Sequence, residues 1–173
     1  MKKLICGLIS VCMLFSLCAC SSEEKTELPT ENNYDDIAPV LGAEVENSEN
    51  IGFYALTKNG TYSWEYIDKS GKKVYVEHDG YFCLDDTESL CTFTREQTGG
   101  SITLKFSGSV SDYKIYQAPC EEIENDKTKI LDDKYLVSTS SKTITFPESG
   151  EYYYVVNVNY DQGEVPYGFL LAE

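Results

Sequence analysis

A single histidine, His78, is the residue on which most familiar side-chain chemistry in this sequence would depend. A triad of nucleophile, histidine and acid needs an imidazole to move the proton, and a thiol nucleophile at Cys83 or Cys120 would have to recruit the same ring. His78 stands in the stretch EHDG, at the end of an expected strand and beside a glycine turn, where exposed polar residues are common. No glycine-rich phosphate loop, HExxH stretch or paired CxxC occurs in the chain. We therefore expect no catalytic residues and no enzyme activity.

Clusters of carboxylates are the next candidates, because Ca²⁺ binds about six to eight oxygens. The clusters are Asp35 and Asp36; Asp85, Asp86 and Glu88; Glu121, Glu122 and Glu124; and Asp132 and Asp133. None has the alternating spacing of a dedicated calcium loop, so we interpret them as solvated acidic turns. Asp85, Asp86 and Glu88 are the weak candidate if a metal site exists, and we expect neither a metal nor a cofactor.

The chain contains 14 tyrosines, and exposed tyrosines bind sugars and peptides at a small cost in entropy. Most of them alternate with polar residues in a way that predicts core positions. Tyr75, Tyr116 and Tyr153 fall on the opposite, outward phase. We expect these three aromatics to form any ligand-binding face.

The first 20 residues have the pattern of an export signal. Lys2 and Lys3 precede an apolar run of 14 residues, Leu4 to Leu17, which is shorter than the roughly 20 residues of a membrane-spanning helix. The stretch Leu17-Cys18-Ala19-Cys20 resembles the bacterial lipobox, although Cys18 stands where alanine, serine or threonine is usual. The resemblance implies that Cys20 receives a diacylglycerol on its thiol and becomes the first residue after cleavage. The alternative is an ordinary cleaved signal with a cysteine at the cut.

Charge and composition divide the rest of the chain in two. Without residues 1–19 it carries 12 basic and 29 acidic residues, a net charge of −17, so nucleic acids and anionic lipid surfaces are poor partners. Residues 20–50 hold nine acidic residues and one lysine, which predicts a flexible, disordered, acidic tether, of which residues 37–41 could dock on the following domain. Residues 51–173 are long enough for one domain with its own core.

Three cysteines follow Cys20. Cys83 and Cys91 flank the expected turn LDDTESL, and an exported chain can form disulfides, so this pair is the candidate bridge. Cys120 would then remain a thiol. The alternative is that all three are reduced and partly buried.

Alternating apolar and polar residues predict an all-β domain over residues 51–173. Residues 61–77 predict a hairpin around DKSGKK, and residues 150–173 predict the strongest strand pair, joined by DQGE. Residues 121–129 are expected to form a loop or one helical turn. Further strands are expected at 54–58, 89–94, 101–107, 112–118, 134–139 and 142–146. Many short strands without a helical period favour an antiparallel β-sandwich.

Two resemblances refine this prediction. The stretch PESGEYYY resembles the immunoglobulin-type approach to a late strand, with Tyr152 as the tyrosine that ties back to the preceding loop, Tyr154 in the place of the second cysteine and Trp64 as the buried tryptophan of an early strand. The stretches GTYSWEY, GYFCLDD and GEYYYVVNVNYDQGEVPYGFLLAE together resemble a family of small lipoproteins of Gram-positive anaerobes, with Cys83 replacing a usual proline. That family implies an immunoglobulin-like β-sandwich on a lipid anchor and supplies no catalytic residues.

The expected protein is thus an extracellular lipoprotein, anchored to the cell membrane through Cys20, that acts as a binding or accessory module. The expected partner is an envelope protein, and the alternative is a module that binds the cell wall or another glycan.

Replacing Cys20 with alanine should release the chain from the membrane fraction, because the lipid would lose its attachment point. Fractionation of cells that express either form measures this, and the intact mass of the unsubstituted chain should include the lipid. A Cys20→Ala chain that stays in the membrane, or an unmodified Cys20, would contradict the prediction.

Overall fold

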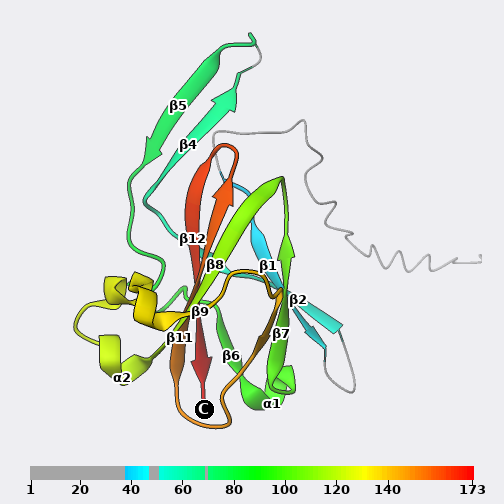
Figure 1. Ribbon diagram of the computed structural model, residues 1–173, viewed down its shortest axis with the longest axis vertical. Helices are drawn as coiled ribbons and strands as arrows, with labels where there is room; N and C mark the ends of the chain where they lie inside the picture. The colour runs from blue at the N-terminus through cyan, green and yellow to red at the C-terminus, as the bar shows by residue number, and fades with distance from the viewer. Residues whose placement is uncertain (1–37, 47–50, 69) are drawn as a thin grey trace, which may run out of the picture.

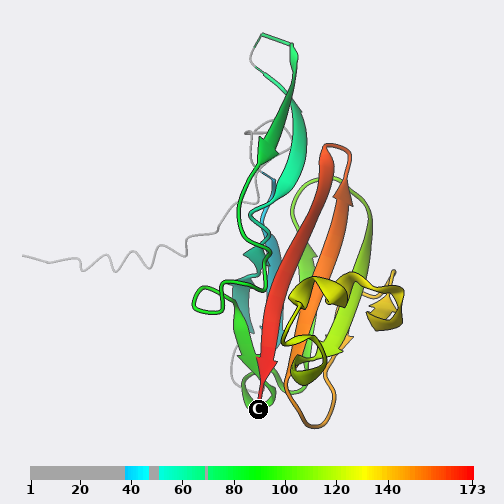
Figure 2. The same cartoon turned by 90° about the vertical axis from the view of Figure 1, so that its left-hand side faces the viewer.

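The computed structural model of this protein describes residues 38–46, 51–68 and 70–173. These residues form two mainly antiparallel sheets that pack face to face, and a separate two-stranded hairpin (Figures 1 and 2). The predictions for the leader, for Cys20 and for residues 20–37 lie outside the described residues.

The two sheets divide the strands between them. The first sheet has the order β10-β7-β1-β2, with β10 Thr143–Thr145, β7 Ser101–Phe106, β1 Leu41–Glu46 and β2 Ile51–Ala55. The second has the order β3-β12-β11-β8-β9, with β3 Thr57–Lys58, β12 Gly163–Ala172, β11 Tyr152–Tyr160, β8 Val110–Pro119 and β9 Leu136–Ser138. A further short strand, β6 Thr92–Thr94, runs parallel to β12 at the edge that β3 also pairs.

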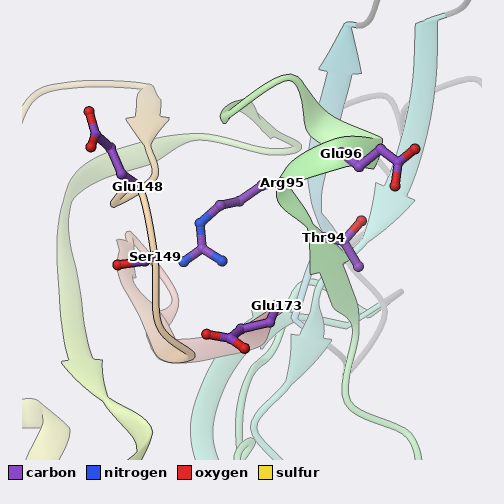
Figure 3. A pocket seen from close by; sticks show the side chains of 6 residues that line it. All are labelled: Thr94, Arg95, Glu96, Glu148, Ser149 and Glu173. Carbon is purple, nitrogen blue, oxygen red and sulfur yellow. The ribbon is translucent and has the colours of Figure 1, made fainter.

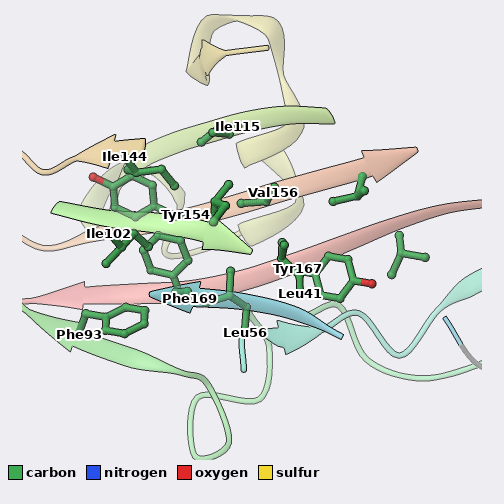
Figure 4. Close-up of a cluster of buried hydrophobic side chains, with 14 of the residues drawn as sticks. Leu41, Leu56, Phe93, Ile102, Ile115, Ile144, Tyr154, Val156, Tyr167 and Phe169 are labelled. Carbon is green, nitrogen blue, oxygen red and sulfur yellow. The ribbon is translucent and has the colours of Figure 1, made fainter. Parts of the chain in front are cut away.

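The main core lies between the sheets (Figure 4). It contains the side chains that the alternating pattern predicted to point inward. Tyr154 of β11 and Phe169 of β12 stack with ring centroids 4.6 Å apart, and Ile102 and Ile144 of the first sheet are buried in the same cluster. The inward phase predicted for β11 and β12 is therefore confirmed.

The chain passes repeatedly between the two sheets of the sandwich. After β7 in the first sheet the chain forms β8 and β9 in the second, returns to β10, and crosses again to β11 and β12. The predicted antiparallel sandwich is confirmed. Trp64 is buried, as expected, but it belongs to the separate hairpin and not to the central strands of the sandwich.

A second cluster covers the other face of β8 and β11. The insertion between β8 and β9 contains α2 Cys120–Ile123 and the 3₁₀ helices η1 Lys127–Leu131 and η2 Asp133–Tyr135. Its Ile123, Ile130 and Tyr135 pack with residues of the loop before β6 and with the outward phase of the strands. The side chains of β8 and β11 on this face were expected to be exposed, and their burial is the largest departure from the sequence-based expectation. The insertion that covers them is polar in sequence, so its few apolar residues gave no sign of a second core.

The folded domain begins earlier than residue 51. Strand β1 pairs with both β2 and β7, and its Leu41, Ala43 and Val45 are buried in the main core. The expected boundary at 50/51 is thus wrong for residues 41–46: an acidic stretch becomes a core strand because every second residue is apolar while Glu44 and Glu46 lie on the outer phase.

Replacing Leu41 with alanine should lower the free energy of unfolding by about 2–5 kcal/mol, because the side chain is fully buried. Its neighbour Val40 is exposed, and Val40→Ala should change the free energy of unfolding by about 0.5 kcal/mol or less. Denaturant unfolding of both variants measures the difference. Equal stabilities would place residues 41–46 outside the core.

Candidate functional site

The β4–β5 hairpin, called the arm below, projects past the turn between β11 and β12 (Figures 1 and 2). Strands β4 Tyr62–Ile67 and β5 Lys73–His78 pair along their whole length, from Tyr62 opposite His78 to Ile67 opposite Lys73. The hairpin predicted for residues 61–77 is confirmed, but alternation alone did not reveal that it leaves the sandwich.

Two glycines form the neck of the arm, just before β4 and just after β5. A Cβ atom on Gly60 would lie 2.8 Å from the Cα of Gly80, so neither position has room for a side chain. The Thr61 hydroxyl donates to the Gly80 carbonyl at 2.6 Å, and Gly60 N–H donates to the Tyr81 carbonyl at 3.0 Å. The neck is therefore a close backbone contact held by hydrogen bonds.

The base of the arm is packed against the sandwich. Trp64 is fully buried, with its ring 5.5 Å from that of Tyr160. Glu65 N–H donates to the Gln162 carbonyl at 2.9 Å, and Gly163 lies so close to β4 that a Cβ there would collide with the Ser63 carbonyl. These contacts fix the base to the β11–β12 turn.

The start of the described chain is held at the same place. Ala38 N–H donates to the Tyr62 hydroxyl at 3.3 Å, and the Lys58 ammonium donates to the Ala38 carbonyl at 3.2 Å. The Tyr167 hydroxyl donates to the Pro39 carbonyl at 2.5 Å. Burial lowers the pKa of Lys58. The N-terminal segment thus enters the domain beside the arm, while the C-terminus lies at the opposite end (Figure 1).

One face of the arm carries an exposed aromatic in a fixed position. Tyr75 is 57% exposed, and its hydroxyl donates to Ser63 Oγ at 2.9 Å, with Glu77 Oε1 at 3.2 Å. Ile67, 61% exposed, lies on the same face nearer the tip. The Asp68 carboxylate closes the turn by accepting hydrogen bonds from the N–H and the hydroxyl of Ser70. The bond from the Ser70 hydroxyl is the main cause that lowers the pKa of Asp68.

The other two expected ligand-face aromatics are not part of this surface. Tyr116 is 4% exposed within the second cluster, so its prediction as a ligand-face residue is wrong. Tyr153 is partly buried at the margin of that cluster, with the Lys127 ammonium 5.1 Å from its ring centroid. Both are on the outward phase as predicted, but α2, η1 and the loop before β6 cover that face.

His78 lies at the end of β5, on the apolar face of the arm. Its ring stacks on Tyr62 with centroids 4.4 Å apart. The ring therefore helps to pack the base of the arm.

The three cysteines of the domain are free thiols, so the candidate Cys83–Cys91 bridge is wrong. Cys83 is buried in the second cluster, whereas Cys91 packs against the main core, so the two lie on different faces of the second sheet. Burial raises the pKa of Cys83 to about 12 and the pKa values of Cys91 and Cys120 to about 11. The spacing of Cys83 and Cys91 along the chain could not reveal that they lie on opposite faces of the second sheet.

The acidic cluster at 85–88 is exposed. Asp86 caps a turn by accepting from the Ser89 hydroxyl at 2.5 Å and from Ser89 N–H at 3.3 Å, and these contacts lower its pKa. Within residues 38–46, 51–68 and 70–173, His, Cys, Asp and Glu side chains form no group that could hold a metal ion.

An open hollow of about 320 Å³ lies at the far end of the sandwich, beside the short helix α1 Arg95–Thr98 (Figure 3). Arg95 Nε donates to the Pro147 carbonyl at 2.6 Å, and its Nη2 donates to the Gly150 carbonyl. The guanidinium therefore ties α1 to the loop before β11. Arg95 lies between the strands expected at 89–94 and 101–107, and no motif in the sequence marks it.

Comparisons with protein families, with curated proteins and with solved structures found no match for this chain. In the part of the chain that the structure describes, no helix is long and apolar enough to cross a membrane.

Thiol reactivity should follow the raised pKa values. In the native chain at about pH 8, alkylation of Cys83, Cys91 and Cys120 should be slow, slowest at Cys83, and should accelerate towards pH 11, whereas unfolded thiols titrate near 8.5. Because folding raises these pKa values, the thiols should destabilise the fold as the pH rises above about 8.5. Mass spectrometry after timed alkylation measures the rates. A linked Cys83–Cys91 peptide in a non-reducing digest would contradict the assignment.

Proposed function

We propose that this chain is an extracellular lipoprotein, anchored in the cell membrane through Cys20, that acts as a non-catalytic binding or accessory module for an envelope protein. The anchor rests on the leader and on the lipobox resemblance. The contact with the partner is assigned to the arm.

The arm carries this proposal because its exposed apolar side chains stand on a fixed base. An isolated two-stranded hairpin is marginally stable in water, yet this one extends beyond the sandwich with Ile67 and Tyr75 exposed. Tyr66, Val74 and Val76 on its other face are only partly buried. Aromatic and aliphatic side chains of this kind are typical of protein interfaces, and burial against a partner would stabilise the distal half of the arm.

The titratable groups of the domain support a role without catalysis. A nucleophilic cysteine needs a lowered pKa, whereas burial raises the pKa of each of the three thiols. The domain's histidine packs on Tyr62, and Arg95 is bound to backbone carbonyls.

The alternative is a module that binds the cell wall or another glycan. Tyr75 favours it, because a tyrosine held by hydrogen bonds to its neighbours offers a flat face to a sugar ring at little entropic cost. Tyr116 and Tyr153 do not extend this face, so the aromatic surface is smaller than the sequence predicted.

A photo-crosslinking amino acid at position 75 should capture one dominant membrane protein in intact cells. The same amino acid at position 137, which is an exposed valine on the edge strand β9, is the matched control and should capture little. The double variant Ile67→Ser with Tyr75→Ala should lower recovery of the partner about tenfold or more, because central aromatic and aliphatic anchors dominate such interfaces.

Mass spectrometry of the captured material measures both effects. Equal capture from positions 75 and 137 would contradict a docking arm. Wall fragments captured at position 75, with no protein, would favour the glycan-binding module.

A further inference from the structure

We infer that two copies of this chain associate through strand β2, whose free edge pairs antiparallel with β2 of the second copy. This surface is separate from the arm, so the inference goes beyond the proposed function.

Strand β2 is unlike the other outer strands of the sandwich. At the remaining edges, β3 has two residues, and β6, β9 and β10 have three each, and such short edges resist further pairing. Strand β2 has five residues, and its Phe53 and Ile51 are 68% and 61% exposed. Within the described residues, only β1 pairs with it. Among the outermost strands of the two sheets, β2 is therefore the longest, and it carries two exposed apolar side chains.

The hydrogen-bond phase shows which backbone groups the edge presents. Leu56 N–H donates to the Leu41 carbonyl at 2.9 Å, and hydrogen-bonded pairs alternate along an antiparallel ladder. Gly52 and Tyr54 therefore direct their backbone groups to β1. The N–H and C=O groups of Ile51, Phe53 and Ala55 point away from β1, towards the free edge.

A second copy of β2 complements this edge. With Phe53 opposite Phe53 of the partner subunit, Ile51 lies opposite the partner's Ala55, and all three outward residues meet outward residues. Each such pair exchanges two backbone hydrogen bonds. The two Phe53 rings would lie directly across from each other on the outer face of the sheet, where aromatic pairs stabilise neighbouring strands.

Charge does not oppose this arrangement locally. Glu44 lies opposite Phe53 on β1, and its carboxylate is paired with Lys105 at 3.0 Å. In the joined sheet the two Glu44 residues would be three strand spacings apart, about 14 Å, which exceeds the screening length of about 8 Å at physiological ionic strength. The whole chain still carries a net charge of −15, so added salt should strengthen the pairing.

The contact is too small for a tight dimer in solution. Five residues of one strand bury far less than the roughly 1,600 Å² of a standard interface. Two copies held in one membrane would have a raised effective concentration, and only this step rests on the proposed anchor at Cys20.

Cysteine crosslinking of the full-length chain in intact cells tests the register. Phe53→Cys should give a disulfide-linked dimer after mild oxidation, because opposed Cα atoms about 5.5 Å apart suit a disulfide. The unsubstituted chain sets the baseline for the native thiols, and Glu44→Cys, one strand away, should stay at that baseline. Co-expressed Ile51→Cys and Ala55→Cys chains should crosslink to each other more than either does to itself.

A charged edge should block the pairing. Phe53→Lys should lower chemically crosslinked dimer about tenfold, whereas Thr145→Lys, on the outer strand at the other edge of the same sheet, should leave it unchanged. For the purified full-length chain, sedimentation should show more dimer as the salt concentration rises.

The inference is overturned if Phe53→Cys crosslinks no more than Glu44→Cys. It is also overturned if added salt dissociates the dimer, because attraction between opposite charges would then hold the two copies together. Cys20→Ala should reduce the amount of dimer in cells without changing its register. If that variant stays in the membrane, the proposed anchor fails while the edge pairing stands.

Discussion

Burial of both faces of β11 is the constraint on which the rest of this structure depends. Tyr154 and Val156 face the first sheet, and Val155 between them is buried in the second cluster. A strand covered on both sides needs two layers, and one chain supplies them as the first sheet and the insertion between β8 and β9. The long antiparallel ladders of β11 with β12 and β8 place it inside the second sheet, between these two layers.

The same constraint leaves the arm and the β2 edge as the surfaces open to partners. The insertion covers the outward side of β8 and β11, so aromatic residues there serve packing. The hairpin β4–β5 lies beyond this cover, and Tyr62, Trp64 and the Glu65–Gln162 hydrogen bond fix its base to the sandwich. The domain is therefore well packed at its centre, with its exposed apolar side chains concentrated at the periphery.

Local alternation was enough to predict most of the strands after residue 60 and the inward phase of β11 and β12, since a period of two depends only on neighbouring residues. It could not predict burial of Tyr116, because that depends on Ile123 and Ile130 from a polar insertion. Strand β1 was missed because Glu44 and Glu46 made residues 41–46 resemble the acidic stretch before them. The hairpin of the candidate site was predicted, but its projection was not, because the projection is set by Gly60 meeting Gly80 and by β4 meeting Gly163.

The place where the chain enters the domain has a mechanical consequence. Ala38 is bound by Tyr62 of the arm and by Lys58 beside it. If the chain before Ala38 is pulled while a partner holds the arm, part of the load passes from Ala38 through Tyr62 into β4. The rest reaches both sheets, because Lys58 belongs to β3 and the chain continues through Pro39 into β1, so a pull would be felt by the arm and the sandwich together.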